Sequence, residues 1–157
     1  MANLGKLSRA QELVRSLGDP SNGLFSEYAD IALLCGAITT LHLFNERATK
    51  ALQLEPYDGE NVAALNTIFE RRGLEEQFLG EVLDQAGGVV REAGLLFGKG
   101  ACPQYDWSET DGSLIVALAG SFPRQLASEL TFNLGGKLAD VGMQLPDGFV
   151  VIFRGDS

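Results

Sequence analysis

Two continuous apolar runs near the end of the sequence, separated by an amphipathic segment, constrain the fold more than any other feature. They are SLIVALA at residues 113–119 and FVVIF at residues 149–153. Neither run alternates polar with apolar residues, so both are typical of strands buried on two faces. The segment between them carries leucines at helical spacing over residues 122–141. A strand, a crossover helix and a strand form a β-α-β unit whose two strands are parallel.

A further strand and a turn precede this unit. The stretch ACPQYDW at residues 101–107 predicts a strand, and SETDG after it predicts a polar hairpin turn. The turn is rich in oxygen ligands, but it lacks the glycine and glutamate spacing of an EF-hand calcium loop. Tyr105 and Trp107 flank the turn. Their rings either anchor an interface at the edge of the sheet or cover the sheet from inside the molecule.

The first 98 residues carry helical patterns. An apolar stripe predicts a first helix over residues 7–17, and the apolar stretch at residues 24–54 predicts one long helix that packs on several sides. Further stripes predict a short helix over residues 62–69 and a long one over residues 74–97. The first 98 residues are therefore predicted to form a set of packed helices.

Four glycines recur every seven residues: Gly73, Gly80, Gly87 and Gly94. In one helix, this interval returns to nearly the same side and makes a lane without side chains. Each interior glycine costs about 0.5–1 kcal/mol relative to alanine, so the lane needs a compensating helix contact. We expect that contact from the region of residues 36–37 or from a second copy of the chain. The alternative is that Gly87 and Gly88 interrupt the helix.

Together these patterns predict an α+β fold, in which the helical N-terminal two-thirds packs on a small sheet with a C-terminal β-α-β unit. At 157 residues and 45% hydrophobic content, the chain can bury a core as one domain. Residues 1–98 are predicted mainly helical, and residues 99–157 form the hairpin and the β-α-β unit. The apolar strands need a cover, which either the N-terminal helices or another chain supplies.

The formal net charge of −9 argues against direct binding to nucleic acid or to anionic membranes. Residues 56–98 hold eight acidic and three basic side chains. The acidic segment 58–84 is either a solvated helix surface or a face for a basic protein partner. In the second case its carboxylates imitate the phosphates of a nucleic acid.

The sequence favours a cytoplasmic location. Cys35 and Cys102 do not make a disulfide framework, and the N-terminal residues lack the apolar core of a secretion signal. The stretch at residues 31–44 has no charged residue, but its fourteen residues fall short of the roughly 20 that span a bilayer. We therefore expect a buried helix there and no membrane span.

One strand-to-helix turn has the features of an anion site. Gly120 and Ser121 end an apolar strand just before a helix, whose free amides can bind an anion, and Arg124 adds a positive charge. The glycine motifs of nucleotide sites are absent, and Ser121 is not part of a G-x-S-x-G elbow. His42 is the only histidine. No catalytic group, metal site or cofactor is therefore predicted.

The tripeptide Arg154-Gly155-Asp156 matches an integrin-recognition motif. It directly follows an apolar strand, whereas such a motif acts on an exposed loop. A short motif also recurs by chance, so we interpret it as the end of the strand.

These observations favour a small, acidic, non-enzymatic protein that binds other proteins as an assembly subunit or adaptor and self-associates. The predicted interface residues are Gly80, Gly87, Gly94, Tyr105, Trp107, Phe149 and Val151. One alternative is a small-ligand or anion-binding protein, or an enzyme, that uses Gly120, Ser121 and Arg124. Another is an acidic inhibitor that imitates nucleic acid on a basic partner.

Overall fold

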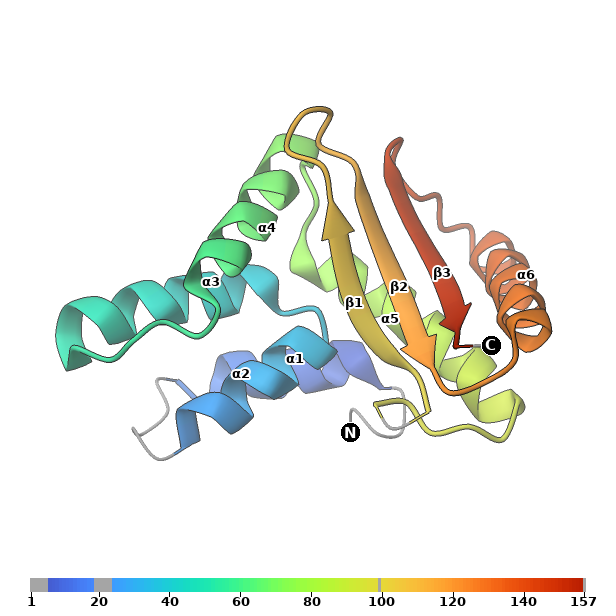
Figure 1. Cartoon of the computed structure of the whole chain (residues 1–157), viewed down its shortest axis with the longest axis horizontal. Helices are drawn as coiled ribbons and strands as arrows, with labels where there is room; N and C mark the ends of the chain where they lie inside the picture. Colours follow the sequence, from blue (N-terminus) through green and yellow to red (C-terminus); the bar gives the residue numbers. More distant parts are fainter. Residues whose placement is uncertain (1–5, 19–23, 99, 157) are drawn as a thin grey trace.

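The computed structural model describes residues 6–18, 24–98 and 100–156 and confirms the α+β architecture. Helices fill the N-terminal part, and the strands lie in the C-terminal half (Figure 1). The helices are α1 (Leu7–Ser16), α2 (Phe25–Leu34), α3 (Ile38–Arg47), α4 (Gly59–Arg72), α5 (Glu76–Glu92) and α6 (Arg124–Asp140), with a π-helical turn η3 (Ala48–Leu52) after α3. The strands are β1 (Cys102–Trp107), β2 (Leu114–Gly120) and β3 (Phe149–Gly155).

The strands form one sheet in the order β1-β2-β3. β1 and β2 are an antiparallel hairpin, while β2 and β3 are parallel and are joined through α6. The predicted β-α-β unit is therefore confirmed. Rows of side chains cross the sheet, as where Tyr105 pairs with Val116 and Val116 pairs with Val151.

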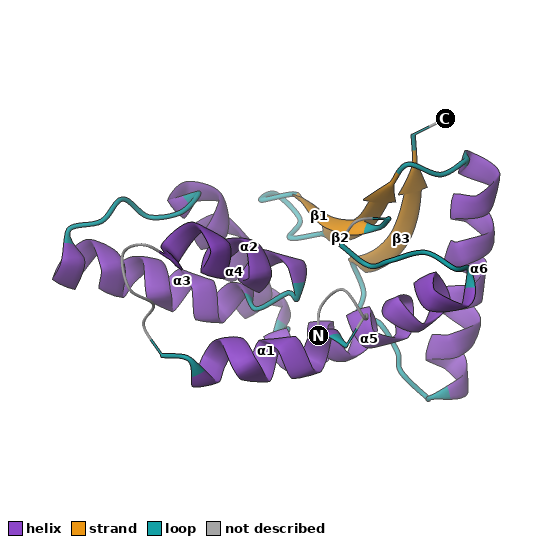
Figure 2. Cartoon of the chain, turned by 90° about the horizontal axis from the view of Figure 1, so that it is seen from below, coloured by secondary structure: helices purple, strands orange, loops and turns teal. Residues whose placement is uncertain are grey.

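The helices cover one face of this sheet. α5 runs behind the strands in Figure 1 and beneath them in Figure 2, and α6 lies beside β3 in both views. The ring of Phe78 on α5 packs against that of Phe149 on β3, with centroids 6.4 Å apart. On α6, the hydroxyl of Thr131 accepts the outward amide of Phe153 at 2.9 Å, so the helix also shields part of the free edge of β3.

α1 is anchored on α5 through its first turn. The carboxylate of Asp84 accepts the amide of Ser8 at 3.2 Å and also accepts the Leu7 amide and the Ser8 hydroxyl. A negative charge at a helix N-terminus satisfies free amides and favours the helix dipole. The cap of α1 thus comes from 76 residues further along the chain.

The prediction of one helix over residues 24–54 is wrong. The chain breaks between α2 and α3, where Gly36 adopts a left-handed conformation with φ of +73°. A Cβ at Gly36 would lie 2.7 Å from Leu79 Cδ2, so the break lies directly against α5. A stretch that is apolar on all sides has no stripe to interrupt, and the break was therefore invisible in the pattern.

The predicted long helix over residues 74–97 is present as the shorter α5, but the four glycines do not form a lane along it. Gly73 has φ of +59° and ends α4, whereas Gly94 has φ of +73° and ends α5. Such left-handed glycines terminate helices. Gly80 and Gly87 do lie inside α5, and Gly87 and Gly88 do not interrupt it. The four glycines at seven-residue spacing therefore have two different roles: Gly73 and Gly94 end helices, and Gly80 and Gly87 lie inside one.

Candidate functional site

The two faces of the sheet differ in what covers them. Side chains of a strand point alternately to opposite faces, so the strand register divides them into two sets. Val116, Val151 and Phe153 belong to the set that is buried against the helices. The other set, here called the open face, consists of Cys102, Gln104 and Asp106 of β1, Ile115, Ala117 and Ala119 of β2, and Val150, Ile152 and Arg154 of β3. Figure 2 shows no described helix over this face.

Apolar side chains form the centre of the open face and the corner at Val150. Val150 is 44% exposed and Ile115 is 37% exposed, and the two are paired across neighbouring strands. Ile152 is half-buried beside Ala117. Single exposed hydrophobic side chains are common on proteins, whereas a contiguous exposed group on a sheet is a candidate binding surface.

An ion pair crosses the open face diagonally. Arg154 Nη2 donates to Asp106 Oδ2 at 2.9 Å, and the side chains are 47% and 56% exposed. Asp106 pairs in register with Ile115, whereas Arg154 pairs with Ala119, so the two charged residues lie at opposite corners. The line between them passes over Ala117, which is fully buried. The ion pair therefore bridges the face across this central position.

The aromatic and strand residues predicted at an interface lie on the covered face instead. Phe149 is 3% and Val151 is 6% exposed. Tyr105 and Trp107 are half-buried and pack against the core. The Tyr105 hydroxyl donates to Leu33 O at 2.6 Å, and burial raises the pKa of this phenol. These side chains therefore line the inside of the sheet, and their alternate neighbours face outward.

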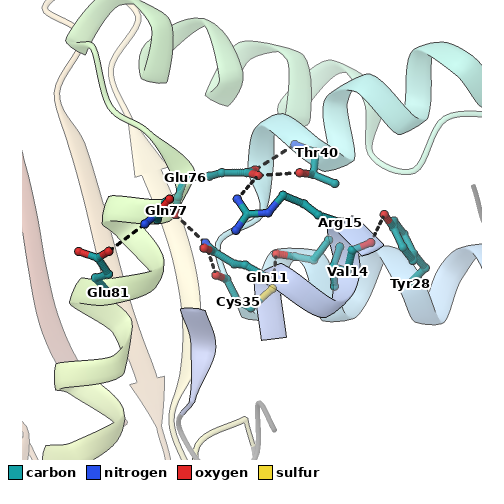
Figure 3. Close-up of polar contacts among 10 residues, drawn as sticks. Gln11, Val14, Arg15, Tyr28, Cys35, Thr40, Glu76, Gln77 and Glu81 are labelled. Atoms are coloured by element: carbon teal, nitrogen blue, oxygen red, sulfur yellow. Dashed lines mark hydrogen bonds and ion pairs between the residues drawn. The ribbon is translucent and has the colours of Figure 1, made fainter. Parts of the chain in front are cut away.

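Gly80 is the place where α1 approaches α5. A Cβ at Gly80 would overlap the amide of Gln11 and lie 2.6 Å from its Cδ. Gln11 is fully buried, and its Nε2 donates to Cys35 O at 2.8 Å and to Glu76 O at 2.6 Å (Figure 3). The close helix contact at Gly80 is thus made by α1 of the same chain, and not by the predicted region of residues 36–37. Gly87 is buried, Gly94 is exposed, and their role in an interface between copies stays a prediction.

The same region holds a polar junction between α1, α3 and α5. The Glu76 carboxylate accepts Thr40 N at 3.0 Å, Thr40 Oγ1 at 2.6 Å and Arg15 Nη1 at 3.2 Å (Figure 3). Burial raises the pKa of the nearby Cys35 thiol to about 12. A thiol with this pKa is protonated and unreactive at neutral pH. The junction therefore holds helices together and offers no nucleophile.

The turn at Gly120 and Ser121 is filled by atoms of the chain itself. A Cβ at Gly120 would overlap Gly100 O and the ring of Phe122. Ser121 Oγ donates to Asp156 Oδ2 at 3.1 Å, so a carboxylate of the chain lies beside the start of α6. Arg124 is exposed at that start. The anion site stays a prediction.

Both charged residues of the Arg154-Gly155-Asp156 motif make contacts within the chain. Asp156 accepts the hydrogen bond from Ser121 Oγ, and Arg154 forms the ion pair with Asp106.

The acidic segment 58–84 is partly used for internal contacts. Asp84 caps α1, Glu76 holds α3, and Glu70 accepts the Asn66 amide at 2.9 Å. Glu75 and Glu81 are exposed. The structure thus leaves a smaller carboxylate surface than the count of acidic residues implies, and binding to a basic partner stays a prediction.

Two further properties concern only the described part of the chain. No group of three or more histidine, cysteine, aspartate or glutamate side chains is arranged to hold a metal ion there. No helix in that part is both long and apolar enough to cross a membrane.

Comparison with protein-family models, with curated protein sequences and with solved structures finds no match to this chain. The geometry of the open face is therefore the feature of the chain that bears on function.

The residues of the open face were missed as a set by sequence reasoning. One signal was available in β1, where polar Gln104 and Asp106 alternate with Tyr105 and Trp107 and indicate the outward side. In β2 and β3 both faces are apolar, and their pattern does not distinguish the covered side from the open one.

Proposed function

We propose that the chain is a non-enzymatic protein that binds other proteins through the open face, as a subunit or adaptor of an assembly. The exposed apolar group on β2 and β3 is the observation that carries the proposal, because a sheet of this kind is normally covered on both sides. Cys35 and Cys102 are free thiols, which fits the reducing cytoplasm.

The polar groups around the apolar centre also suit a protein interface. Asp106, Gln104 and Arg154 form a rim that can supply charged and hydrogen-bonding contacts, while the centre supplies buried apolar area. Arginine is enriched where interfaces carry most of their binding energy. The filled turn at Gly120 gives no comparable support to an enzyme or anion-binding protein.

The proposal is tested by capture of partners from host extract with immobilised protein. A Val150→Glu variant places a charge in the apolar part of the open face, at a side chain that is 44% exposed and makes little contribution to the core. Leu17→Glu is the matched control, because Leu17 is 70% exposed at the end of α1, which packs on α5 on the covered side.

We expect at least one protein to be retained by the wild type and by Leu17→Glu and to be lost from Val150→Glu. Circular dichroism must show that both variants keep the wild-type helix content. Identical sets of retained proteins from all three baits would exclude the open face as the surface that binds host proteins.

A further inference from the structure

The charges on the open face are arranged so that the face can complement itself. In the strand register, Asp106 and Val150 lie at one end of the face, and Cys102 and Arg154 lie at the other. The acid and the base thus occupy opposite corners, with Ala117 between them. The face as a whole carries no net charge, although the chain has a formal net charge of −9.

We propose that the partner of the open face is a second copy of this chain, packed face to face about a two-fold axis along the diagonal from Cys102 to Val150. The inference rests on the proposed function, because it names the occupant of the same surface. Rotation about this axis places Arg154 opposite Asp106 of the partner subunit. It also places Ile115 opposite Ile152 of the partner subunit.

Charge selects this axis among the symmetric arrangements of the face. An axis along the other diagonal places Asp106 opposite Asp106 of the partner subunit, and Arg154 opposite Arg154 of the partner subunit. Axes parallel or perpendicular to the strands place each charge opposite Val150 or Cys102 of the partner subunit. Like charges in contact, and charges buried against apolar groups, both oppose association. Only the Cys102–Val150 diagonal pairs each charge with its opposite.

When two copies associate, the two ion pairs within the separate chains are replaced by two ion pairs between the chains. Arg154 now bonds Asp106 across the face of its own chain, and both side chains are about half exposed. In the pair of subunits, each Arg154 turns to Asp106 of the partner subunit, so the number of ion pairs is unchanged. The ion pair then no longer bridges the centre, and the apolar groups of the two sheets meet. The strands of the two sheets cross steeply, as in orthogonal sheet packing.

The small size of the face predicts weak association. Three strands spaced about 4.8 Å apart, with about 3.4 Å per residue, give a flat area of roughly 300 Å². Stable interfaces bury about 800 Å² on each partner. We therefore expect a reversible pair with a dissociation constant of about 100 µM.

Charge reversal tests the pairing, with sedimentation velocity as the readout up to about 500 µM protein. The two variants are Arg154→Glu and Asp106→Lys, and both altered side chains are about half exposed. Each variant has like charges at both corners, within its own chain and between identical copies. In an equimolar mixture, an Arg154→Glu copy can pair with an Asp106→Lys copy. The two substituted side chains then lie opposite each other with opposite charges, and the unchanged Asp106 of the first copy lies opposite the unchanged Arg154 of the second. Mixing cannot restore the ion pair within either chain, so it isolates the contact between subunits.

We expect the wild type to associate, each variant alone to associate at least about tenfold more weakly, and the mixture to recover to within about threefold of the wild type. Circular dichroism confirms that both variants are folded. A mixture that associates no better than its components would overturn the proposed axis.

A wild-type chain that stays monomeric at about 500 µM would show that the partner of the open face is not a second copy. If the wild type is monomeric but retains a host protein that the Val150→Glu variant does not retain, the open face binds a different protein. The proposed function then survives without this inference. If Val150→Glu loses nothing, both fail.

Discussion

Arg72 shows how a single residue joins three parts of the chain. It lies at the end of α4, and its guanidinium donates to Asp111 O at 2.5 Å, Gly112 O at 2.8 Å and Asp147 O at 2.9 Å. These carbonyls belong to the β1–β2 turn and to the loop before β3. Gly148 has φ of +76°, and a Cβ there would lie 2.8 Å from the guanidinium. Arg72 thus ties the β1–β2 turn and the loop before β3 to the end of α4.

Replacement of Arg72 by lysine is expected to destabilise the fold by about 2 kcal/mol, because an ammonium group cannot reach all three carbonyls in the planar geometry of a guanidinium. Urea denaturation followed by circular dichroism measures this loss. The neighbouring Arg71 donates to one carbonyl, Glu109 O at 2.7 Å, and is exposed. Arg71→Lys should therefore cost less than about 0.5 kcal/mol. Equal losses from the two variants would contradict the role of Arg72.

Cys35 is expected to make stability depend on alkaline pH. Its pKa is raised from 9.0 to about 12, mainly by burial. Between these values the unfolded thiol loses its proton while the folded thiol keeps it, so the unfolded state is favoured as pH rises. The stability gap between the wild type and Cys35→Ala should narrow by about 1.4 kcal/mol per pH unit above pH 9. Denaturation at pH 8, 9 and 10 measures the gap, and a constant gap would contradict the buried thiol.

At the scale of elements, two glycines of α5 should respond to alanine in opposite directions. At Gly80 the new Cβ would displace the buried Gln11 amide, whose bonds to Cys35 O and Glu76 O join α1 to α2 and α5. At Gly88 the nearest side-chain atoms are 3.8 Å away. Gly80→Ala is expected to destabilise by about 1–3 kcal/mol, and Gly88→Ala to stabilise by about 0.5–1 kcal/mol. Thermal and urea unfolding provide the measurement.

A double variant separates the Gln11 contact from a general effect on the helix. In a Gln11→Ala background the Cβ of Gly80→Ala has room, and its cost should shrink by at least about 1 kcal/mol. An undiminished cost would show that Gln11 is not the obstacle.

The elements that could be predicted are those whose pattern depends on local burial. Helix α4 and strands β2 and β3 were predictable, because one apolar stripe or one apolar run marks each of them. The break at Gly36 was not, because it depends on contact with α5 and not on the local pattern. The glycine spacing misled for a related reason, since Gly73 and Gly94 end helices through their backbone conformation.

The candidate site was less predictable than the fold. The sequence indicates that β2 and β3 are apolar on both faces. It therefore predicts that the N-terminal helices or another chain cover them. It does not show that the helices take the face of Val151 and leave the face of Val150, because both side chains are valines with the same apolar character. Which face stays open follows from where α5 lies, and that is set by long-range packing.

At the scale of the whole molecule, the net charge opposes the association of two copies. With centres about 30 Å apart, twice the radius of gyration of a chain this long, charges of −9 on each copy repel by about 11 kcal/mol in water without salt. Screening reduces this to about 4 kcal/mol at 0.01 M salt and to about 0.3 kcal/mol at 0.15 M. Contacts of the open face act at short range and are screened far less.

Self-association is therefore expected to strengthen by roughly several hundredfold between 0.01 M and 0.15 M NaCl, as measured by sedimentation. Asp140→Lys is the control, because Asp140 is exposed at the end of α6 and the variant has a net charge of −7 instead of −9. It should raise association at low salt and leave it unchanged at 0.15 M. Association that weakens as salt is added would mean that ion pairs, and not the apolar centre of the open face, hold the copies together.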